Sequence, residues 1–347
     1  MAKKIKIAIA GYGVVGKLRH KSINSNKSFE LIAVCDNKFE KNGVFDSGVK
    51  FYRNYEDLLN LDIDAILVCL TNDIAAKVTF AALKKNKHVF CEKPPGISMS
   101  EIYKIYKYVS KNKNLKLMYG FNHRYHESVQ EAISIVKSKQ YGKIINMRAV
   151  YGKSNLITFN QSDWRTKRKV SGGGILLDQG IHMLDLLRLF AGEFKKFQSN
   201  VSNNYWNFDV EDNVYTIMES KKGVIATLNS SATQWPHKFL LEINLEHGSI
   251  ILSGILTNSK SYGSESIKII SKKDKKLKPK IKEYFQDKSW EKELSYFSDC
   301  IKNNKTIKTS NITDAFETMK LVFSIYYSDI SWRKKYKIKN PHKYDIH

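Results

Sequence analysis

The stretch that decides the fold is residues 5–16, which read IKIAIAGYGVVG. Its first half is a short apolar run typical of a buried strand, and its second half is a Gly-x-Gly-x-x-Gly turn that opens a segment with helical spacing. In such a unit the first glycine permits a tight turn, the second lets the backbone approach a pyrophosphate, and the third lets helix and strand pack closely. The N–H groups and dipole at the helix start attract phosphate. Residues 5–16 therefore predict a dinucleotide-binding unit.

Apolar runs and helical segments continue to alternate over the first third of the chain. Further strands are expected at residues 31–35, 65–70, 89–91 and 115–119, and helices at residues 14–23, 74–85 and 102–109. Near-continuous apolar strands between helices indicate a parallel sheet covered on both faces and joined by right-handed crossovers. We predict a doubly wound Rossmann domain over residues 1–122.

The pattern changes after residue 122. A helix is expected at residues 128–139, followed by turn-separated strands at 144–151, 213–219, 224–232, 240–245 and 249–252, and by late helices at 290–301 and 312–330. The lysine-rich stretch 272–282 is interpreted as an exposed loop or hairpin tip. Residues 123–347 thus predict a second α/β domain with a mostly antiparallel sheet, and its final helices can pack back on the first domain.

Composition excludes several classes of protein. The chain has 347 residues, of which 42% are hydrophobic and 27% charged, so it is globular rather than disordered. No apolar run reaches the roughly 18 residues of a membrane span, and the N-terminus lacks the apolar core of a signal peptide. Four cysteines without a Cys-x-x-Cys pair do not make a disulfide framework. We expect a cytoplasmic protein.

The formal net charge of +24 raises the question of a polyanionic partner. The basic residues comprise 50 lysines and only 8 arginines, and the lysines are spread along the chain. Nucleic-acid readers use arginine forks. Asparagine is also abundant, and this pattern fits a coding bias toward lysine and asparagine as well as it fits a binding function. A general attraction for anionic substrates stays open, and a dedicated nucleic-acid site is the minor interpretation.

Asp36 ends the second predicted strand, twenty positions after Gly16. A carboxylate at this place accepts hydrogen bonds from an adenosine ribose diol and repels a 2′-phosphate. Lys38 softens that repulsion. The pattern favours NAD over NADP, with the adjacent Asn37 among the cofactor-binding residues, and it argues against a glycine turn without a ligand.

The fourth predicted strand ends in Glu92-Lys93-Pro94. Ligands of doubly wound sheets bind outside the carboxyl ends of the strands, so Lys93 is expected where a nicotinamide and a substrate meet. A lysine there can polarise a substrate oxygen or move a proton. Glu92 could accept hydrogen bonds from the cofactor's ribose or hold the lysine.

Residues 171–185 read SGGGILLDQGIHMLD. Three glycines suit a loop that approaches a ligand, and the following helical spacing puts Asp178 and His182 on one face, one turn apart, with Asp185 three residues further along. A carboxylate beside an imidazole can orient it and stabilise its charged form, which makes a general acid/base unit. A polar helix face with a satisfied histidine is the alternative; the coincidence with the glycines and Lys93 favours the catalytic interpretation.

Together these motifs resemble the Gfo/Idh/MocA oxidoreductases, the family named for glucose–fructose oxidoreductase and inositol dehydrogenase. The resemblance covers essentially the whole chain and includes Gly11–Gly16, Asp36, Glu92–Pro94, Gly120–Tyr125, Trp164-Arg165 and Gly172–Asp185. It implies a Rossmann domain, a second α/β domain with a large open sheet, a nicotinamide at their interface, and a homodimer or homotetramer.

The resemblance assigns roles residue by residue. It implies that Lys93, Asp178 and His182 are catalytic. It implies a substrate site formed by Lys93, Arg124, Tyr151, Arg165, Asp178 and His182. The cofactor-binding residues that it implies are Gly11, Tyr12, Gly13, Val14, Val15, Gly16, Asp36, Asn37, Leu70, Thr71, Asn72, Glu92, Lys93, Asn122, Trp164 and Arg165. Two departures concern cofactor contacts: Ala75 stands where the family has a histidine, and Glu127 where it has a proline.

The expected reaction is reversible hydride transfer between a nicotinamide and a sugar carbinol carbon. His182 takes the hydroxyl proton, Asp178 orients it and Lys93 stabilises the oxyanion, although Lys93 could instead be the main proton carrier. Residues 209–213, 230–235 and 261–265 resemble a subgroup acting on nucleotide sugars in surface polysaccharide synthesis, or are simply strand and turn residues. A catabolic sugar or inositol dehydrogenase, an NAD-dependent glycosidase and a non-catalytic NAD sensor stay open. The histidines show no metal-ligand spacing, and no metal is expected.

Overall fold

The computed structural model describes residues 3–156, 163–257, 259–274 and 276–345. The chain divides into two units. Unit 1 comprises residues 1–122 and 290–316, and unit 2 comprises residues 123–289 and 317–347. Helix α8 (Ser289–Lys302) therefore belongs almost entirely to unit 1, although it lies far along the chain from the other elements of that unit.

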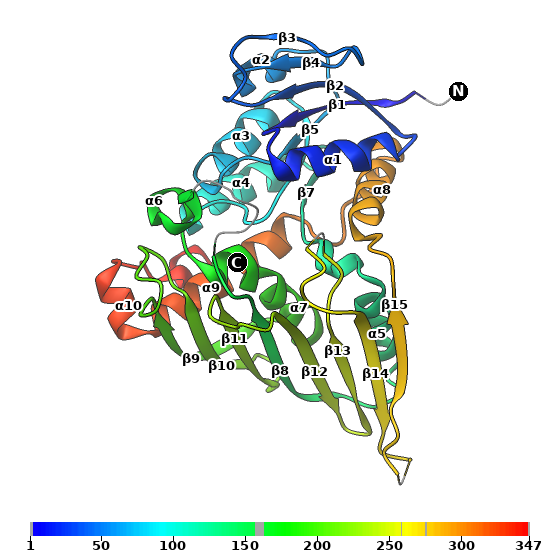
Figure 1. Ribbon diagram of the computed structural model, residues 1–347, viewed down its shortest axis with the longest axis vertical. Coiled ribbons are helices and arrows are strands. Elements are labelled where there is room, and N and C mark those ends of the chain that lie inside the picture. Colours follow the sequence, from blue (N-terminus) through cyan, green and yellow to red (C-terminus); the bar gives the residue numbers. More distant parts are fainter. Residues whose placement is uncertain (1–2, 157–162, 258, 275, 346–347) are drawn as a thin grey trace. The chain divides into compact units, whose positions relative to one another are not determined.

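The described part of unit 1 is built on a seven-stranded sheet in the order β3-β4-β2-β1-β5-β6-β7 (Figure 1). All neighbouring pairs are parallel except β3–β4. The order runs outward in both directions from β1, so the strand order reverses between β1 and β5, where doubly wound sheets bind their ligands. The strands are β1 (Ile5–Ala10), β2 (Phe29–Cys35), β3 (Gly43–Val44), β4 (Lys50–Tyr52), β5 (Ala65–Val68), β6 (His88–Cys91) and β7 (Leu117–Tyr119).

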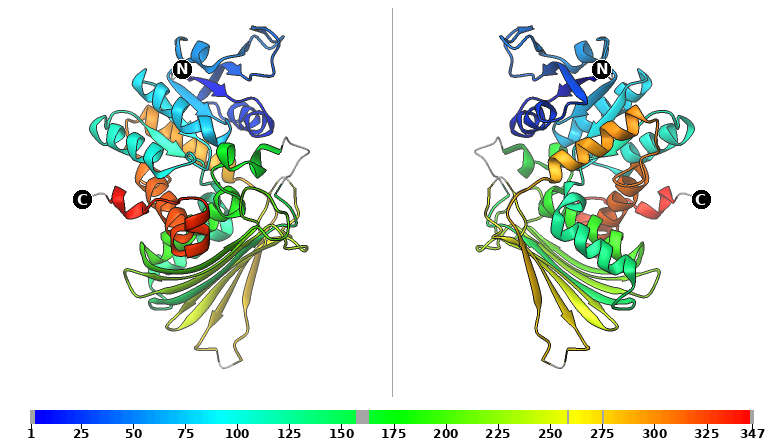
Figure 2. Two further views of the ribbon diagram at one scale, coloured as in Figure 1. Left: turned by 90° about the vertical axis from the view of Figure 1, so that its left-hand side faces the viewer. Right: turned by 90° about the vertical axis from the view of Figure 1, so that its right-hand side faces the viewer.

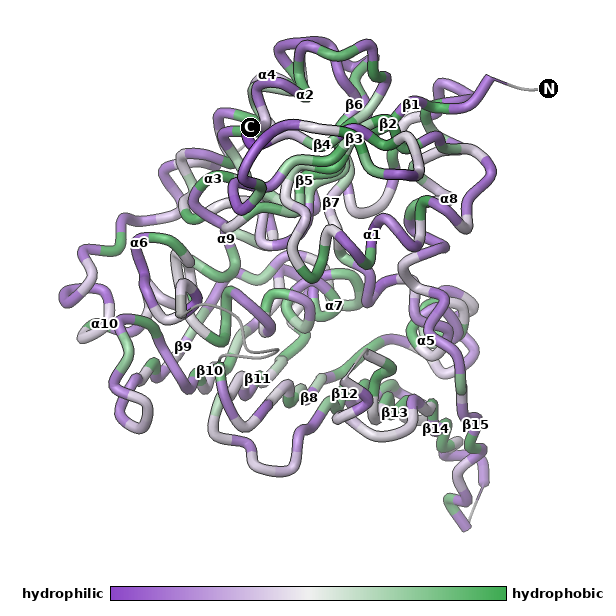
Figure 3. Tube along the Cα trace, turned by 45° about the horizontal axis from the view of Figure 1, so that its top comes forward, coloured by the Kyte–Doolittle hydropathy of each residue, from purple (hydrophilic) through white to green (hydrophobic). Residues whose placement is uncertain are grey.

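Helices α1 (Val14–Asn24), α2 (Tyr55–Leu59), α3 (Asn72–Lys84) and α4 (Met99–Lys111) connect these strands. Strand β5 is buried over its whole length, and Figure 3 shows the hydrophobic colour concentrated near it at the centre of the sheet. Helix α4 begins in a capping box, in which the Ser98 hydroxyl accepts from the Glu101 N–H at 3.4 Å and the Glu101 carboxylate accepts from the Ser98 N–H at 3.1 Å. The predicted doubly wound fold is confirmed.

Unit 2 is built, within its described residues, on an eight-stranded sheet in the order β15-β14-β13-β12-β8-β11-β10-β9. Strands β8 and β11 are parallel and the other neighbours antiparallel, which confirms the mostly antiparallel sheet. The strands are β8 (Ile144–Gly152), β9 (Phe194–Ser202), β10 (Asn213–Ser220), β11 (Ile225–Ser231), β12 (Lys238–Leu245), β13 (Gly248–Ser253), β14 (Glu265–Ser271) and β15 (Lys280–Tyr284).

The helices of unit 2 lie on one face of this sheet, as Figure 2 shows for α5 and α7. Strand β10 reflects this arrangement, because Val214, Thr216 and Met218 are buried while the alternate Tyr215 and Ile217 are exposed. The helices and short helical turns that lie wholly or mostly in the unit are α5 (Glu127–Ser138), α6 (Arg168–Ser171), α7 (Ile181–Ala191), α9 (Ile312–Ser328), α10 (Ile330–Lys335), η1 (Asn122–Tyr125), η2 (Asp163–Thr166), η3 (Leu176–Gly180) and η4 (Pro341–Tyr344).

Several edge elements differ from the sequence-based expectations. Strands β3 and β4 and helix α2 are too short to give a periodic pattern, and β9 reads FKKFQSNVS, a largely polar edge strand. The predicted loop 272–282 is the connection of the β14–β15 hairpin that projects from the sheet in Figure 1, but its last residues already belong to β15. Lysines commonly mark such edge strands because they discourage further pairing. Among the described helices, none combines the length and apolarity needed to cross a membrane.

Candidate active site

The glycine turn of unit 1 lies between β1 and α1 at the point where the strand order reverses. Gly11 has φ +93°, and a Cβ there would collide with the Cys69 carbonyl, while a Cβ at Gly16 would collide with the Gly11 carbonyl. A Cβ at Gly13 would meet nothing within 4 Å. Gly11 and Gly16 are therefore needed for chain packing, whereas Gly13 leaves open space in front of the N-terminus of α1. This arrangement fits the pyrophosphate of a dinucleotide.

Asp36 is oriented toward this turn. Its Oδ2 accepts from the Tyr12 N–H at 3.0 Å and its Oδ1 from the Lys38 N–H at 3.0 Å. The Tyr12 hydroxyl lies 2.6 Å from Nδ1 of His20, a residue of α1. Asp36 is thus a fixed carboxylate beside the turn, which suits recognition of a ribose diol. The neighbouring Asn37 is exposed.

The loop after β5 borders the same turn. Leu70 follows the Cys69 carbonyl that contacts Gly11, and its side chain would lie 3.1 Å from a Cβ at Gly11. Thr71 caps α3, and Asn72, the first residue of that helix, is buried. The structure thus brings Leu70 to the glycine turn, with Thr71 and Asn72 following it in the chain, and the contact of each with a cofactor stays a prediction.

Glu92 is held by an arginine that the sequence analysis did not single out. Arg19 Nε lies 2.6 Å from Glu92 Oε1, and the Arg19 guanidinium also pairs with Glu293 at 2.5 Å. This guanidinium is 0% exposed, and its Cζ lies 4.6 Å and 4.1 Å from the ring centroids of Phe90 and Trp290. Burial alone lowers the pKa of Arg19, but the charges of Glu293 and Glu92 more than offset this and hold its pKa above the usual value.

The buried ion pair of Arg19 could have been suspected from the sequence. Arg19 lies on the face of α1 that also buries Gly16 and Ile23, a spacing of three and seven residues. An arginine on the apolar face of a helix requires a buried anion. Lys93 itself follows directly in the chain, and its bond to Pro94 is cis.

In unit 2, Arg124 forms a bidentate ion pair with Asp185. Its Nε donates to Asp185 Oδ2 and its Nη2 to Oδ1, both at 2.6 Å, and Thr318 Oγ1 donates to the same carboxylate at 3.2 Å. The pair fastens the η1 turn, which begins at Asn122, to α7. Asp185 was expected on the same helix face as Asp178 and His182. In the structure its carboxylate pairs with Arg124 and joins two elements of the fold. Contact of Arg124 with a substrate, and of Asn122 with a cofactor, stay predictions.

The segment that carries Asp178 is not a regular α-helix. Residues Leu176–Gly180 form one π-helical turn, and α7 begins at Ile181. The segment is therefore a π-turn followed by an α-helix rather than one continuous α-helix, and the placing of Asp178 and His182 on one face stays a prediction. Such turns are frequent at functional sites.

Glu211 anchors the glycine run that precedes this turn. Its carboxylate accepts from the Gly174 N–H at 2.8 Å, the Leu176 N–H at 3.0 Å and the Tyr326 hydroxyl at 2.6 Å. A Cβ at Gly174 would collide with the Glu211 backbone carbonyl. Burial raises the pKa of Glu211 despite the opposing charge of Arg168 and these hydrogen bonds. Glu211 falls in the 209–213 stretch and positions the loop.

Asp178 lies between two cations. Lys153 Nζ approaches its Oδ2 at 3.3 Å, and Arg165 Nε approaches its Oδ1 at 3.4 Å. Lys153 is buried at the end of β8, and the Arg165 guanidinium stacks 4.3 Å from the Trp164 ring. The two positive charges stabilise an ionised Asp178. The sequence analysis did not identify Lys153, because its only distinguishing feature is its position directly after the end of strand β8.

His182 is buried on α7 and stacks on His123, with ring centroids 3.9 Å apart and 10° between the ring planes. His123 Nε2 lies 2.9 Å from the Tyr151 hydroxyl. Burial raises the pKa of Tyr151 well above its usual value, so this hydroxyl keeps its proton. The structure thus brings His182 and Tyr151 together through a histidine that the sequence analysis quoted only as part of a motif.

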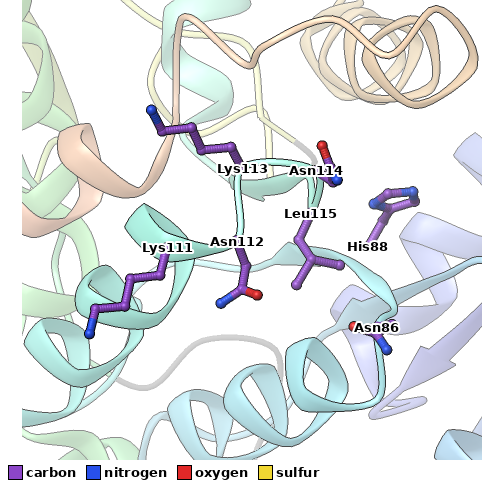
Figure 4. A pocket seen from close by; sticks show the side chains of 7 residues that line it. All are labelled: Asn86, His88, Lys111, Asn112, Lys113, Asn114 and Leu115. Carbon is purple, nitrogen blue, oxygen red and sulfur yellow. The ribbon is translucent and has the colours of Figure 1, made fainter.

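The described residues contain no group of three or more His, Cys, Asp or Glu side chains arranged to hold a metal ion. A hollow of about 590 Å³ in unit 1 is lined by residues that include His88, Asn112 and Leu115 (Figure 4). It lies where β6 and β7 begin. Because Glu92 and Lys93 follow the opposite end of β6, this hollow is not part of the candidate site.

The geometry defines a Rossmann unit with an open glycine turn and a second unit with a buried His182 and a carboxylate, Asp178, held by two cations. Residues 5–121 match the family model for the oxidoreductase family with an NAD-binding Rossmann fold, and residues 129–251 match the GFO/IDH/MocA C-terminal domain. The chain belongs to the GFO/IDH/MocA family of oxidoreductases, which confirms the resemblance drawn from its motifs.

Individual relatives are distant. Glucose-6-phosphate 3-dehydrogenase of Bacillus subtilis (strain 168) is 29% identical over 195 residues, which cover 54% of this chain and 55% of that protein. D-glucoside 3-dehydrogenase of Escherichia coli (strain K12) is 27% identical over 250 residues, which cover 65% of this chain and 70% of that protein. Levoglucosan dehydrogenase in complex with NADH has the same fold, with a TM-score of 0.82 at 18% identity over 95% of this chain and 98% of that one. The first of these matches spans about half of the relative's length.

Proposed function

We propose that this protein is an NAD-dependent oxidoreductase that moves a hydride between the nicotinamide and a hydroxyl-bearing carbon of a sugar or polyol. The observation that carries the proposal is the buried His182, which follows a carboxylate held by two cations within one short segment. A buried imidazole in the same short segment as a fixed carboxylate suits a general base. The family and the sugar substrates named for its relatives support the same conclusion.

The residues of unit 1 would hold the cofactor. The open space at Gly13 admits the pyrophosphate, and Asp36 accepts hydrogen bonds from the adenosine ribose. Because Asp36 is fixed by two backbone N–H groups, it cannot easily turn away from a 2′-phosphate, which favours NAD over NADP. When bound, NAD supplies the hydride acceptor.

The remaining steps belong to the chain's own side chains. His182 takes the proton of the substrate hydroxyl, Lys93 stabilises the developing oxyanion, and Asp178 keeps the charge balance beside Lys153 and Arg165. In the reverse direction His182 returns the proton. Lys93 is the alternative proton carrier. A positioned acid or base of this kind contributes about 10²–10⁴-fold to the rate.

The substrate is proposed to be a free or phosphorylated sugar, a glycoside or an inositol. Parts of the stretches suggestive of nucleotide sugars have structural partners: Ser230 packs against Gly180, Asn213 bonds to Thr233 at 3.0 Å, and Glu265 accepts from Ser128. These contacts favour their interpretation as strand and turn residues. A nucleotide sugar stays the alternative substrate. The homo-oligomer and the cytoplasmic location stay predictions.

The test is nicotinamide absorbance with purified protein, NAD or NADP, and a panel of glucose, glucose 6-phosphate, methyl glucosides, inositols and UDP-sugars. We expect reduction of NAD with a member of the sugar or polyol set, and loss of turnover with retained NAD binding in His182→Ala and Lys93→Met. Normal turnover in both variants would overturn the assignment. If no substrate reduces NAD although NAD binds, a glycosidase acting through transient oxidation or a sensor becomes the better conclusion.

A further inference from the structure

The rings of His123 and His182 are stacked on each other. The two rings come from different elements, η1 and α7, and both side chains are nearly inaccessible, at 4% and 6% exposure. With 3.9 Å between centroids and 10° between planes, the rings are in van der Waals contact over their faces. Rotation of the His182 ring about its Cβ–Cγ bond would drive its edge into the His123 ring. The stack therefore fixes the plane of the His182 imidazole.

His123 is itself fixed on several sides. Its Nε2 lies 2.9 Å from the Tyr151 hydroxyl, and the Phe239 ring meets it edge-on with centroids 5.9 Å apart. The next residue, Arg124, is clamped to Asp185, three residues after His182 on the same helix. The η1 turn and α7 are thus tied together directly beside the stack. A ring held in this way is a rigid platform rather than an adaptable neighbour.

The surroundings of the His123–His182 pair favour protonation of at most one of the two rings. The groups that face His123 are His182, Tyr151 and His126, and His126 is paired with Glu265 at 2.7 Å and lies 3.9 Å from Asp287. On the side of His182, α7 carries the Asp185–Arg124 ion pair. Two imidazolium rings stacked at 3.9 Å would repel each other in a buried place. The Tyr151 hydroxyl, which keeps its proton, can donate to a neutral His123.

We propose that His123 is the positioning residue of the proposed reaction: its neutral ring holds His182 in the plane in which His182 accepts the substrate's hydroxyl proton, and its face stabilises the imidazolium that forms. The step is balanced, because the substrate loses the proton to His182 and the hydride to the nicotinamide. A flat π face beside a new cation is favourable. This inference rests on the proposed function and adds to it the residue that orients the base.

The test compares His123→Phe, which keeps a flat ring, with His123→Ala, which removes it. We measure kcat and KM against pH with the substrate that the panel identifies. In His123→Ala we expect kcat to fall roughly 10- to 100-fold with KM nearly unchanged, and the acid limb of the pH profile to move. His123→Phe should recover most of kcat. His247→Ala, in the exposed turn between β12 and β13, is the matched control.

A second measurement does not depend on turnover. The ring signals of His182 in histidine-labelled full-length protein report stacking through their ring-current shift and report protonation through their titration. Both should change in His123→Ala and largely persist in His123→Phe, with circular dichroism showing that the variants fold. Unchanged kcat, pH profile and His182 signals in His123→Ala would overturn the proposal, as would equal losses in both variants. If the wild type shows no turnover but the His182 signals still change in His123→Ala as expected, the result would count against the proposed function alone.

Discussion

Replacement of Arg19 by methionine is the sharpest test of how unit 1 holds its Glu92-Lys93 segment. Arg19 is fully buried and joins three elements, since it lies on α1, pairs with Glu92 at the end of β6 and pairs with Glu293 on α8. Methionine fills a similar volume but carries no charge. The substitution leaves two carboxylates facing each other in a buried place, with side chains 14% and 0% exposed.

The magnitude follows from the loss of one partner of a buried ion pair. Such a loss costs about 3–5 kcal/mol, because the remaining charge is left without compensation. We expect Arg19→Met to lower the free energy of unfolding by about this amount, since Glu92 and Glu293 then also repel each other. The double variant Arg19→Met, Glu293→Gln removes that repulsion and should recover part of the loss, which a double-mutant cycle measures.

The assay is urea denaturation followed by circular dichroism, with hydrogen exchange on peptides from α1 and α8 to locate the loss in unit 1. Arg53→Met is the control, because Arg53 is exposed in the same unit, and its effect should stay within about 0.5 kcal/mol. A loss below about 1 kcal/mol in Arg19→Met, or no recovery in the double variant, would refute the reasoning that the guanidinium compensates two buried charges.

Two further predictions concern glycines and buried acids. Gly13→Ala should leave stability unchanged and weaken NAD binding at least tenfold by calorimetry, since its Cβ enters open space, whereas Gly11→Ala should destabilise the fold by about 1–3 kcal/mol because of its φ of +93° and the collision with the backbone. Equal NAD affinity in Gly13→Ala and the wild type would contradict the first half. Glu265 and Glu211 should contribute to stability with opposite pH dependence. The measurement is the difference in the free energy of unfolding between the wild type and each Glu→Gln variant, followed against pH. Burial alone would raise the pKa of Glu265, but the hydrogen bonds and charge of His126 and the hydrogen bonds of Ser128 lower it below the ordinary 4.5, so its stabilisation is present above pH 4.5 and is lost as the pH falls through the lower folded value. The raised pKa of Glu211 gives a contribution that is present below pH 4.5 and is lost as the pH rises through the folded value, and a common sign for both would contradict the burial argument.

The fold could be read from the sequence wherever a local pattern determines it. Residues 5–16 combine a strand, a glycine turn and a helix start, and the β1, β5 and β6 strands are short apolar runs because both faces of the sheet are covered. Strands β3 and β9 were not predicted from the sequence. Both are edge strands, which are short or polar, and they form because a neighbouring strand pairs with them rather than because of their own pattern.

The candidate site divides along the same line. Asp36, Lys93 and His182 stand in motifs whose spacing is local. Arg19 and Lys153 do not, because their partners lie 73 and 25 residues away and become neighbours only in the folded sheet. Long-range ion pairs of this kind leave a weak trace, such as a charged residue on an apolar helix face, and the identity of the partner cannot be read from it.

Asp178 and His182 have different neighbours although they lie only four residues apart. In an α-helix, four residues advance by about 400°, so the two side chains would point within about 40° of each other. A π-turn has more residues per turn and advances less per residue, which does not move these two residues to different faces. Their neighbours differ because each side chain meets a different element: Asp178 reaches Lys153 and Arg165, while His182 faces His123. The Asp178 carboxylate thus balances the charge of two cations, whereas the stacked His123 ring orients the His182 imidazole. Loss of Asp178 should therefore impair the reaction through charge, and loss of His123 through geometry.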